Sequence, residues 1–186
     1  MPFIEVVDEA DAQGRLREIY DSIIDSRGKL ADVHRIQSLN PESITAHMDL
    51  YMAVMFGRSP LSRAQREMMA VVVSRANDCQ YCQVHHCRAL LHHWKDEERV
   101  EGLRADWESA DLDSPDRELC RYAWSLSLDP GRAVEDRYAP RLRAAGLSDR
   151  AILDATLVVS YFNFVNRMVT GLGVELEEDP GGYRYD

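Results

Sequence analysis

Apolar residues recur at intervals of three and four along most of the chain, which is the spacing of helices that bury one face. The pattern predicts helices at residues 10–26, 41–56, 63–76, 79–94, 96–103, 115–127, 134–145 and 148–172. Nowhere do strands alternate with helices, so we predict a single all-α domain spanning residues 1–186. Residues 176–186 are expected to form an irregular polar tail.

Residues with capping preferences predict where several of these helices begin. Asn40 and Pro41 form an N-cap and first-position pair. Ser62 and Gln65 have the spacing of a capping box at the start of the next helix. Asp78 follows a break and is expected to cap a helix that begins at the cysteines.

A weak internal repeat relates residues 61–90 to residues 147–174. A shift of 86 residues places Ser62 on Ser148 and Asn77 on Asn163, and several apolar positions also match. The second copy has apolar residues at the positions of the candidate chemistry: Leu153 for Glu67, Val165 for Cys79, Met168 for Cys82 and Leu172 for His86. We therefore expect any chemistry to lie in the first copy alone, the alternative being chance likeness between two buried helices.

Composition narrows the classes of function. The 186 residues are enough for a sizeable core, and the formal net charge of −10 argues against nucleic acid and anionic membrane surfaces as partners. No apolar run has the length of a membrane span, and the opening MPFIEVVDEADAQG lacks the features of a signal peptide. We expect a cytoplasmic protein, in which a CxxC pair is catalytic or binds metal.

Four residues in one stretch form the most informative pattern. Cys79 and Cys82 have CxxC spacing, Glu67 precedes them by twelve residues, and His86 follows by four. If the stretch is helical, positions i, i+3 and i+7 place both thiols and the imidazole on one face. A thiol reacts as the thiolate, so a neighbouring base is what such a pair needs. Glu67 lies among apolar residues, where a carboxylate is either a solvated edge or a partly buried base with a raised pKa.

Zinc binding is the main alternative for these cysteines. The candidate ligands crowd into residues 79–93: Cys79, Cys82, His85, His86, Cys87, His92 and His93. Structural zinc sites usually take two ligand pairs from separate segments, whereas these residues fall on one helix, with His85 and Cys87 away from the cysteine face. A thioredoxin-type role would need a strand before the motif, and here a helix precedes it.

Other residues are weaker candidates. Cys87 and Cys120 are expected to be buried thiols without a partner. The aromatic segment YFNFVNRM, residues 161–168, is expected in the core or in a subunit interface. Three polar residues of this segment are weaker candidates for the active site: Asn163, Asn166 and Arg167.

Two stretches resemble a known family. LSRAQREMMAVVVSRANDCQYCQVHH and YFNFVNRMVTGLGVELE are similar to the AhpD-like alkylhydroperoxidases, and in particular to the peroxidase-related enzymes of the carboxymuconolactone decarboxylase superfamily. The resemblance implies an all-α AhpD-like fold with internal pseudo-symmetry, in obligate homo-oligomers. It also implies that Cys82 attacks a peroxide, that Cys79 resolves the resulting sulfenic acid, and that Glu67 and His86 relay protons. Tyr81 is a departure, since the founding alkylhydroperoxidase has a histidine between the cysteines.

The resemblance and the residues together predict a thiol-dependent hydroperoxide reductase that needs no metal and no other cofactor. Its expected partners are a hydroperoxide substrate, a thiol or lipoyl-type protein reductant, and further copies of the chain. Two alternatives stay open. One is a decarboxylase or lactone-processing enzyme, as in other branches of the superfamily, and the other is a metal- or redox-responsive binding protein without turnover.

Overall fold

The structure is a computed structural model that describes residues 1–131 and 137–184. Helices make up the fold, and the described residues contain no strand, which confirms the all-α prediction. The helices are α1 (Gly14–Arg27), α2 (Asp32–Arg35), α3 (Pro41–Tyr51), α4 (Arg63–Ala76), α5 (Gln80–Trp94), α6 (Glu97–Ala105), α7 (Ser114–Leu128), α9 (Tyr138–Ala144) and α10 (Asp149–Leu172). The first part of the predicted helix 134–145 lies outside the described residues. None of the described helices is long and apolar enough to cross a membrane.

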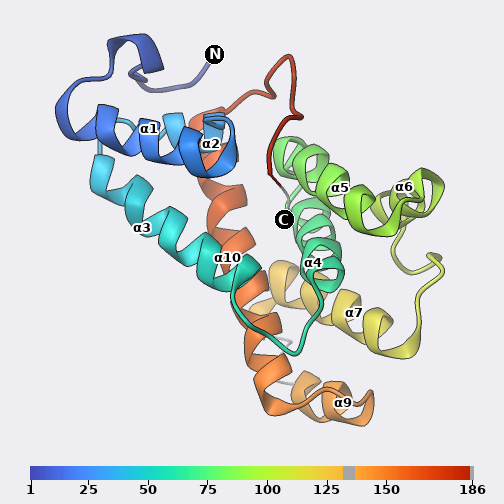
Figure 1. Cartoon of the computed structure of the whole chain (residues 1–186). Coiled ribbons are helices and arrows are strands. Elements are labelled where there is room, and N and C mark those ends of the chain that lie inside the picture. Colours follow the sequence, from blue (N-terminus) through green and yellow to red (C-terminus); the bar gives the residue numbers. More distant parts are fainter. Residues whose placement is uncertain (132–136, 185–186) are drawn as a thin grey trace.

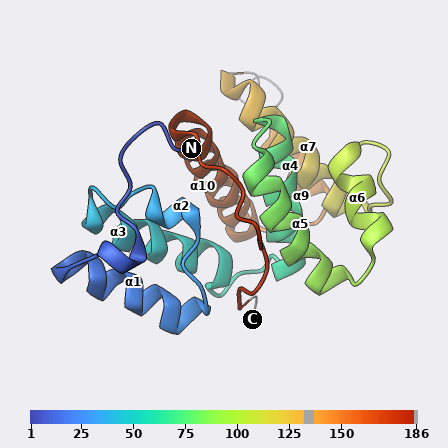
Figure 2. The same ribbon diagram turned by 90° about the horizontal axis from the view of Figure 1, so that it is seen from above.

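The long helix α10 stands between two groups of helices (Figures 1 and 2). α1, α2 and α3 lie on one side of it, while α4, α5, α6 and α7 lie on the other. α4 is the centre of the larger group, because every residue from Arg66 to Ser74 is buried and the helix packs against α5, α7 and α10. A smaller apolar cluster joins α1 to α3. The site described below forms where the two groups meet.

The predicted capping box at Ser62 forms, and the matching serine of the repeat, Ser148, also caps its helix. The side-chain oxygen of Ser62 accepts from the amide of Gln65 at 3.1 Å, and the Gln65 side chain accepts from the amide of Ser62 at 2.9 Å. At the start of α10 the Ser148 hydroxyl accepts from the amide of Ala151 at 3.2 Å. These caps satisfy N–H groups that would otherwise have no partner in the first turn.

α4 and α10 are the helices of the predicted repeat, and they pack against each other. Where α4 ends, Asn77 donates to the side-chain oxygen of Asn163 at 3.0 Å, so two positions separated by 86 residues are in direct contact. The copies also differ, because α4 is followed by a break before α5 whereas α10 runs on without interruption. Descent from a duplication stays a prediction.

The segment after α3 continues as a π-helical turn over Met52–Phe56, and Gly57 ends it. A side chain at position 57 would not fit, because a Cβ there would lie 2.2 Å from the carbonyl oxygen of Ala53. The wide turn ends on Phe56, whose ring contacts two arginines of the site region, Arg27 and Arg63.

The connection between α4 and α5 corrects one prediction. Asp78 does not cap α5, because it adopts a left-handed backbone conformation with φ of 52°. The amide of Asp78 bonds to the carbonyl of Arg75, and the amide of Cys79 bonds to that of Ser74. The helix therefore begins at Gln80, with Cys79 in the N-cap position. A short helix that the pattern did not predict, α2, lies between α1 and α3.

Candidate active site

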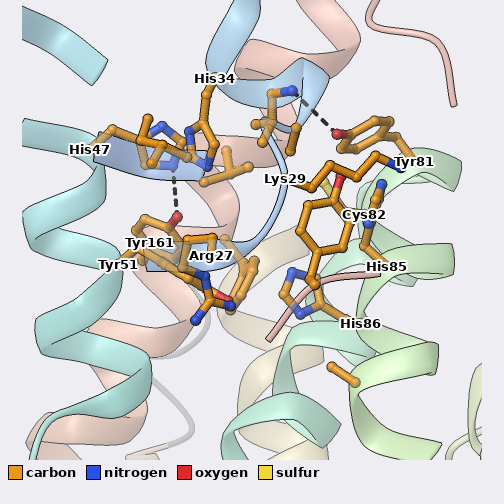
Figure 3. Close-up of a pocket in the computed structure, with 17 residues that line it drawn as sticks. Arg27, Lys29, His34, His47, Tyr51, Tyr81, Cys82, His85, His86 and Tyr161 are labelled. Carbon is orange, nitrogen blue, oxygen red and sulfur yellow. Dashed lines mark hydrogen bonds between the residues drawn. The ribbon is translucent and has the colours of Figure 1, made fainter. Parts of the chain in front are cut away.

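A cavity of about 90 Å³ opens between the N-terminal helices and α5 (Figure 3). His47 and Tyr51 reach it from α3, Tyr161 from α10, and Cys82 and His86 from α5. Phe162 and several aliphatic side chains supply the apolar part of the lining. Two cations, Arg27 and Lys29, also contribute to the wall. The cavity therefore brings the second cysteine of the CxxC motif together with residues from distant segments.

Glu67 lies behind this pocket and has no contact with solvent, since its exposed fraction is 0%. One carboxylate oxygen accepts from Arg63 Nε at 3.0 Å and from Arg63 Nη2 at 2.6 Å, while the other lies 2.6 Å from His86 Nδ1. Burial raises the pKa of Glu67, but the charges and hydrogen bonds of His86 and Arg63 lower it by more. The net pKa is lowered, so the expectation of a base with a raised pKa is wrong.

His86 connects Glu67 to the pocket. A charged carboxylate can only accept, so its contact with Nδ1 assigns a proton to that nitrogen. The ring also packs edge to face against Phe162, with centroids 4.4 Å apart. With Nδ1 held by Glu67 and one ring edge held by Phe162, Nε2 is the atom left to exchange a proton with a group in the pocket.

Cys79 and Cys82 are both free thiols, and each is 2% exposed. The hydrogen bond with Cys82 lowers the pKa of Cys79 to about 7, although burial opposes this shift. The same hydrogen bond, together with burial, raises the pKa of Cys82 well above its ordinary value. Two thiols this close titrate as a pair, so one negative charge near pH 7 belongs to both. Cys82 lines the pocket, whereas Cys79 is not among the lining residues.

A second acidic residue, Glu177, holds the far wall of the pocket. It accepts from the hydroxyl of Tyr81 at 2.7 Å, from the amide of Asp32 at 2.9 Å, and contacts His85 Nε2 at 2.9 Å. Burial raises the pKa of Glu177, and these bonds lower it by more, to about 2. His85 and Tyr183 both line the pocket, so the prediction that His85 points away from the cysteines is wrong.

The predicted tail is irregular through residue 184, but it is part of the site wall rather than a free end. The backbone amide of Arg184 donates to the carbonyl of Arg27 at 3.1 Å. Lys29 donates to the carbonyl of Asp179, and its ammonium lies 5.5 Å from the centre of the Tyr183 ring. Residues 185–186 of the predicted tail lie outside the described residues.

Two polar residues of α10 act directly on the thiols, and one of them, Thr170, lowers the pKa of Cys79 through a side-chain hydrogen bond. The other is Asn166. Its side-chain hydrogen bond to Cys82 lowers the pKa of that thiol, against the larger effects that raise it. Its amide nitrogen also donates to Ser74 at 3.2 Å. Asn163 bonds instead to Ser127, and Arg167 bonds to Asn163, so neither lines the pocket.

The remaining thiols and histidines form no metal-binding group. Within the described part of the chain, no three His, Cys, Asp or Glu side chains are arranged to hold an ion. Cys87 and Cys120 are buried, as expected, and burial raises the pKa of Cys87 to about 12. Burial also raises the pKa of Cys120. Neither thiol is predisposed to ionise near neutral pH.

Comparison with known proteins identifies relatives of this chain. Residues 41–110 match the model of the carboxymuconolactone decarboxylase family. A peroxidase-related protein from Ralstonia eutropha, described as an alkylhydroperoxidase AhpD core, superposes with a TM-score of 0.85 at 22% identity, covering 96% of this chain and 94% of that one. A peroxidase-related protein from Silicibacter superposes with a TM-score of 0.83 at 27% identity, covering 97% of this chain and 95% of the other.

The debrominase Bmp8 has the same fold. It superposes with a TM-score of 0.79 at 17% identity, covering 96% of this chain and 94% of Bmp8. A likeness at this identity concerns the fold alone.

Proposed function

Because the chain is an AhpD-like member of the carboxymuconolactone decarboxylase superfamily, we propose that it is a thiol-dependent hydroperoxide reductase. The observation that carries the proposal is the sequence of contacts from Arg63 through Glu67 to His86, which ends at the pocket lined by Cys82. Two relatives with AhpD-like folds bear peroxidase-related names, which supports the same reaction class.

In the proposed reaction His86 Nε2 takes the proton of the Cys82 thiol, and the Glu67 carboxylate stabilises the imidazolium that forms. The Cys82 sulfur then attacks one peroxide oxygen: an S–O bond forms as the O–O bond breaks. The leaving alkoxide takes the proton from His86 and departs as the alcohol. Cys82 is oxidised by two electrons to the sulfenic acid, and the peroxide is reduced by two.

Cys79 completes the first half of the cycle. Its sulfur attacks the sulfur of Cys82, an S–S bond forms, and the hydroxyl leaves as water after taking the Cys79 proton. A dithiol reductant, free or lipoyl-type, returns both cysteines to thiols by disulfide exchange. Access favours Cys82 as the attacking atom, whereas the lowered pKa favours Cys79. We give access the greater weight. The proton that the two hydrogen-bonded sulfurs share can move from one to the other, so either can become the thiolate, whereas Cys79 stays outside the pocket lining.

Serine substitutions test these roles. We expect Cys82→Ser to abolish hydroperoxide consumption, and Cys79→Ser to consume about one equivalent per chain without turnover. Cys120→Ala is the matched control: it removes a buried thiol outside the site and should keep full turnover at a modest cost in packing. Stopped-flow peroxide consumption and thiol titration report both quantities. Turnover that persists in Cys82→Ser would exclude Cys82 as the attacking residue.

The same assay separates the alternative functions. A redox-responsive binding protein would form the Cys79–Cys82 disulfide with peroxide but would show no turnover with any dithiol. A decarboxylase or lactone-processing enzyme would leave both thiols unchanged in number after peroxide treatment. A metal assay on the purified protein covers the metal-responsive case.

A further inference from the structure

Arg27 is a buried cation without a counter-charge at the pocket. It is the last residue of α1, its exposed fraction is 8%, and it lines the cavity. Within residues 1–131 and 137–184, its guanidinium makes no hydrogen bond and no ion pair; its recorded contacts are with the rings of Phe56 and Tyr51, at 4.7 and 5.6 Å from the centroids. A buried arginine normally has a carboxylate or several acceptors, because burial of a charge is costly.

Arg63, the neighbouring arginine, makes the hydrogen bonds that a largely buried guanidinium needs. Arg63 contacts the same Phe56 ring, with its guanidinium carbon 3.6 Å from the centroid. It also donates twice to Glu67 and once to the carbonyl of Met55. Two cations therefore share one aromatic ring, and Glu67, the carboxylate paired with Arg63, is also bonded to His86.

Among the described residues, no carboxylate lines the pocket to pair with Arg27. Among the described residues that line it there are two cations, Arg27 and Lys29, three histidines besides His86, and no Asp or Glu. Glu177 stands behind the wall and is already bonded to Tyr81, His85 and the Asp32 amide. In a chain with a net charge of −10, a pocket whose charged lining residues, apart from the cysteine pair, are both cations selects anions.

A second polar group in the pocket also lacks a partner. His34 is 9% exposed and lines the cavity, and its Nδ1 has no hydrogen-bond partner among the described residues. Burial and nearby cations hold its pKa at about 3, so the ring is neutral at physiological pH and can give or take one hydrogen bond. The pocket wall thus holds two polar side chains, Arg27 and His34, that have atoms without a hydrogen-bond partner among the described residues.

Arg27 is not explained as a counter-ion for the thiolate. The pKa of Cys82 is shifted by Cys79, by burial and by Asn166, and Arg27 is not among these groups. In Figure 3 its guanidinium lies between the side chains that come from α3 and those that come from α5. Aliphatic side chains and five aromatic ones also line the pocket, the aromatic ones being Tyr51, Tyr81, Tyr161, Phe162 and Tyr183.

We propose that Arg27 is the anion-binding residue of the pocket, and that the preferred substrate is a small aromatic carboxylate that carries its hydroperoxide group at the other end. The guanidinium fork matches a carboxylate with two parallel hydrogen bonds, and the aromatic wall accepts the ring. The electron balance is that of the proposed peroxidase: the carboxylate is unchanged, the O–O bond takes two electrons from Cys82, and a dithiol returns them. The hydroperoxide part of this inference rests on the proposed function, whereas the carboxylate part does not.

Binding of an unreactive pair of probes tests the carboxylate site directly. We expect 4-isopropylbenzoate to bind the reduced protein ten- to a hundredfold more tightly than its neutral isostere 4-isopropylbenzamide, by titration calorimetry. In Arg27→Met the two affinities should become equal. The matched control is Arg17→Met, which removes the same charge from an exposed position on α1 that is paired with Asp21, and which should keep the preference. Equal affinities in the wild type overturn the proposal without any variant.

A matched pair of peroxides then tests the substrate. Cumene hydroperoxide and its 4-carboxylate derivative differ only in the anionic group. We expect kcat/KM to favour the carboxylate by about tenfold or more, Arg27→Met to bring the ratio of the two kcat/KM values to about one, and Arg17→Met to keep the wild-type ratio. If neither peroxide is consumed but the benzoate still binds through Arg27, the proposed function fails and the anion site stands. If both are consumed equally and the benzoate shows no preference, the anion site fails and the peroxidase stands.

Discussion

Glu67 shows how burial and pairing compete for one carboxylate. Burial without solvent contact would keep it protonated, yet Arg63 and His86 together lower its pKa. The side chain is therefore a charge that orients His86 and stabilises its imidazolium, and the proton itself is exchanged at the imidazole. A carboxylate in this position contributes to the structure as well as to the chemistry.

Replacing Glu67 should cost both activity and stability. We expect Glu67→Gln and His86→Ala each to slow peroxide reduction by roughly ten- to ten-thousand-fold, the span for losing acid–base assistance. Glu67→Gln should also lower the free energy of unfolding by about 3 kcal/mol, because Arg63 loses the charge it is paired with. His86→Ala leaves that pair intact and should cost less. Urea unfolding beside the peroxide assay measures both; equal stability losses would contradict this division of roles.

The pair of cysteines should react as a group with a pKa of about 7. The folded chain holds the pKa of Cys79 below its ordinary value of 9.0, so it binds fewer protons than the unfolded chain between pH about 7 and 9. This contribution to stability rises with pH across that window and is lost as the pH falls through about 7. Alkylation by iodoacetamide should follow the same midpoint in the reduced protein.

Cys82→Ala tests the cause of that shift. Its hydrogen bond is the largest influence on the pKa of Cys79, and burial opposes it, so the variant should move the alkylation midpoint upwards. Cys120→Ala removes a thiol outside the site and should leave the midpoint unchanged. A midpoint near 7 in Cys82→Ala would mean that the Cys82 thiol is not what stabilises the thiolate.

For individual residues, the sequence predicts the part of the site that comes from neighbouring helices and not the part that comes from distant segments. Glu67 and His86 are in contact, and Cys82 reaches the same pocket, as their spacing on two adjacent helices indicates. Arg27 and Glu177 have no such signal. Each is one of many charged residues, and only the packing of segments far apart in the chain brings them to the cavity.

Among the elements, helix starts were the most predictable feature, because a serine cap is decided by a few neighbouring residues. Ser62 caps α4 as expected, and the matching Ser148 caps α10. The start of α5 was not predicted correctly, since the left-handed conformation of Asp78 depends on how α4 and α5 are joined rather than on its own capping preference. The short helix α2 escaped the pattern because four residues are too few to show a period.

The irregular segment after α10 should be attached to the fold through Glu177. We expect Glu177→Gln to destabilise the protein by about 1 to 2 kcal/mol and to expose Cys82 to alkylation, because three bonds to the pocket wall are weakened. Glu178→Gln, at an exposed position, is the control and should change neither. Limited proteolysis of this segment, followed by mass spectrometry, reports the detachment.

The same carboxylate predicts an acid effect with a defined sign. The pKa of Glu177 is about 2 in the folded chain against an ordinary value of 4.5. Its contribution to stability is therefore complete above about 4.5 and is lost as the pH falls towards 2. In Glu177→Gln this part of the acid destabilisation should be absent, so the unfolding curves of variant and wild type should converge at low pH.

The whole molecule carries an apolar surface that one chain does not cover. Leu153, Leu157 and Phe164 follow one face of α10 and are 54%, 42% and 49% exposed. Leu50 on α3 is 44% exposed. Apolar positions on one face that stay in water are typical of subunit contacts, so the homo-oligomer stays our prediction.

Sedimentation velocity at micromolar concentration tests it. We expect a mass greater than one chain, and Leu157→Glu should reduce it to that of the single chain by placing a charge in the apolar face. Leu128→Glu, at an exposed position on α7, is the control and should keep the assembly. A single-chain mass for the wild type would refute the oligomer, and loss of assembly in both variants would place the contact elsewhere.

The all-α architecture was predictable as a whole because helical periodicity runs through nearly the entire chain. The location of the site was only partly predictable. The first repeat indicates one wall, α5, while the opposite wall comes from α1, α3 and the segment after α10. Which distant segments meet depends on packing that no periodic pattern encodes, and for that reason the pocket could be named only from the assembled fold.

Residues 177–184 support a part of the pocket wall that lies outside the helices. Helices α4, α5 and α10 carry both the core and the thiols, so a substitution there risks the fold together with the chemistry. Tyr183 lines the cavity from outside the helices. Substitutions at Tyr183 can therefore change which molecules enter while the reaction and the core stay as they are. In descendants of this chain, new substrates should arise first through divergence at this margin.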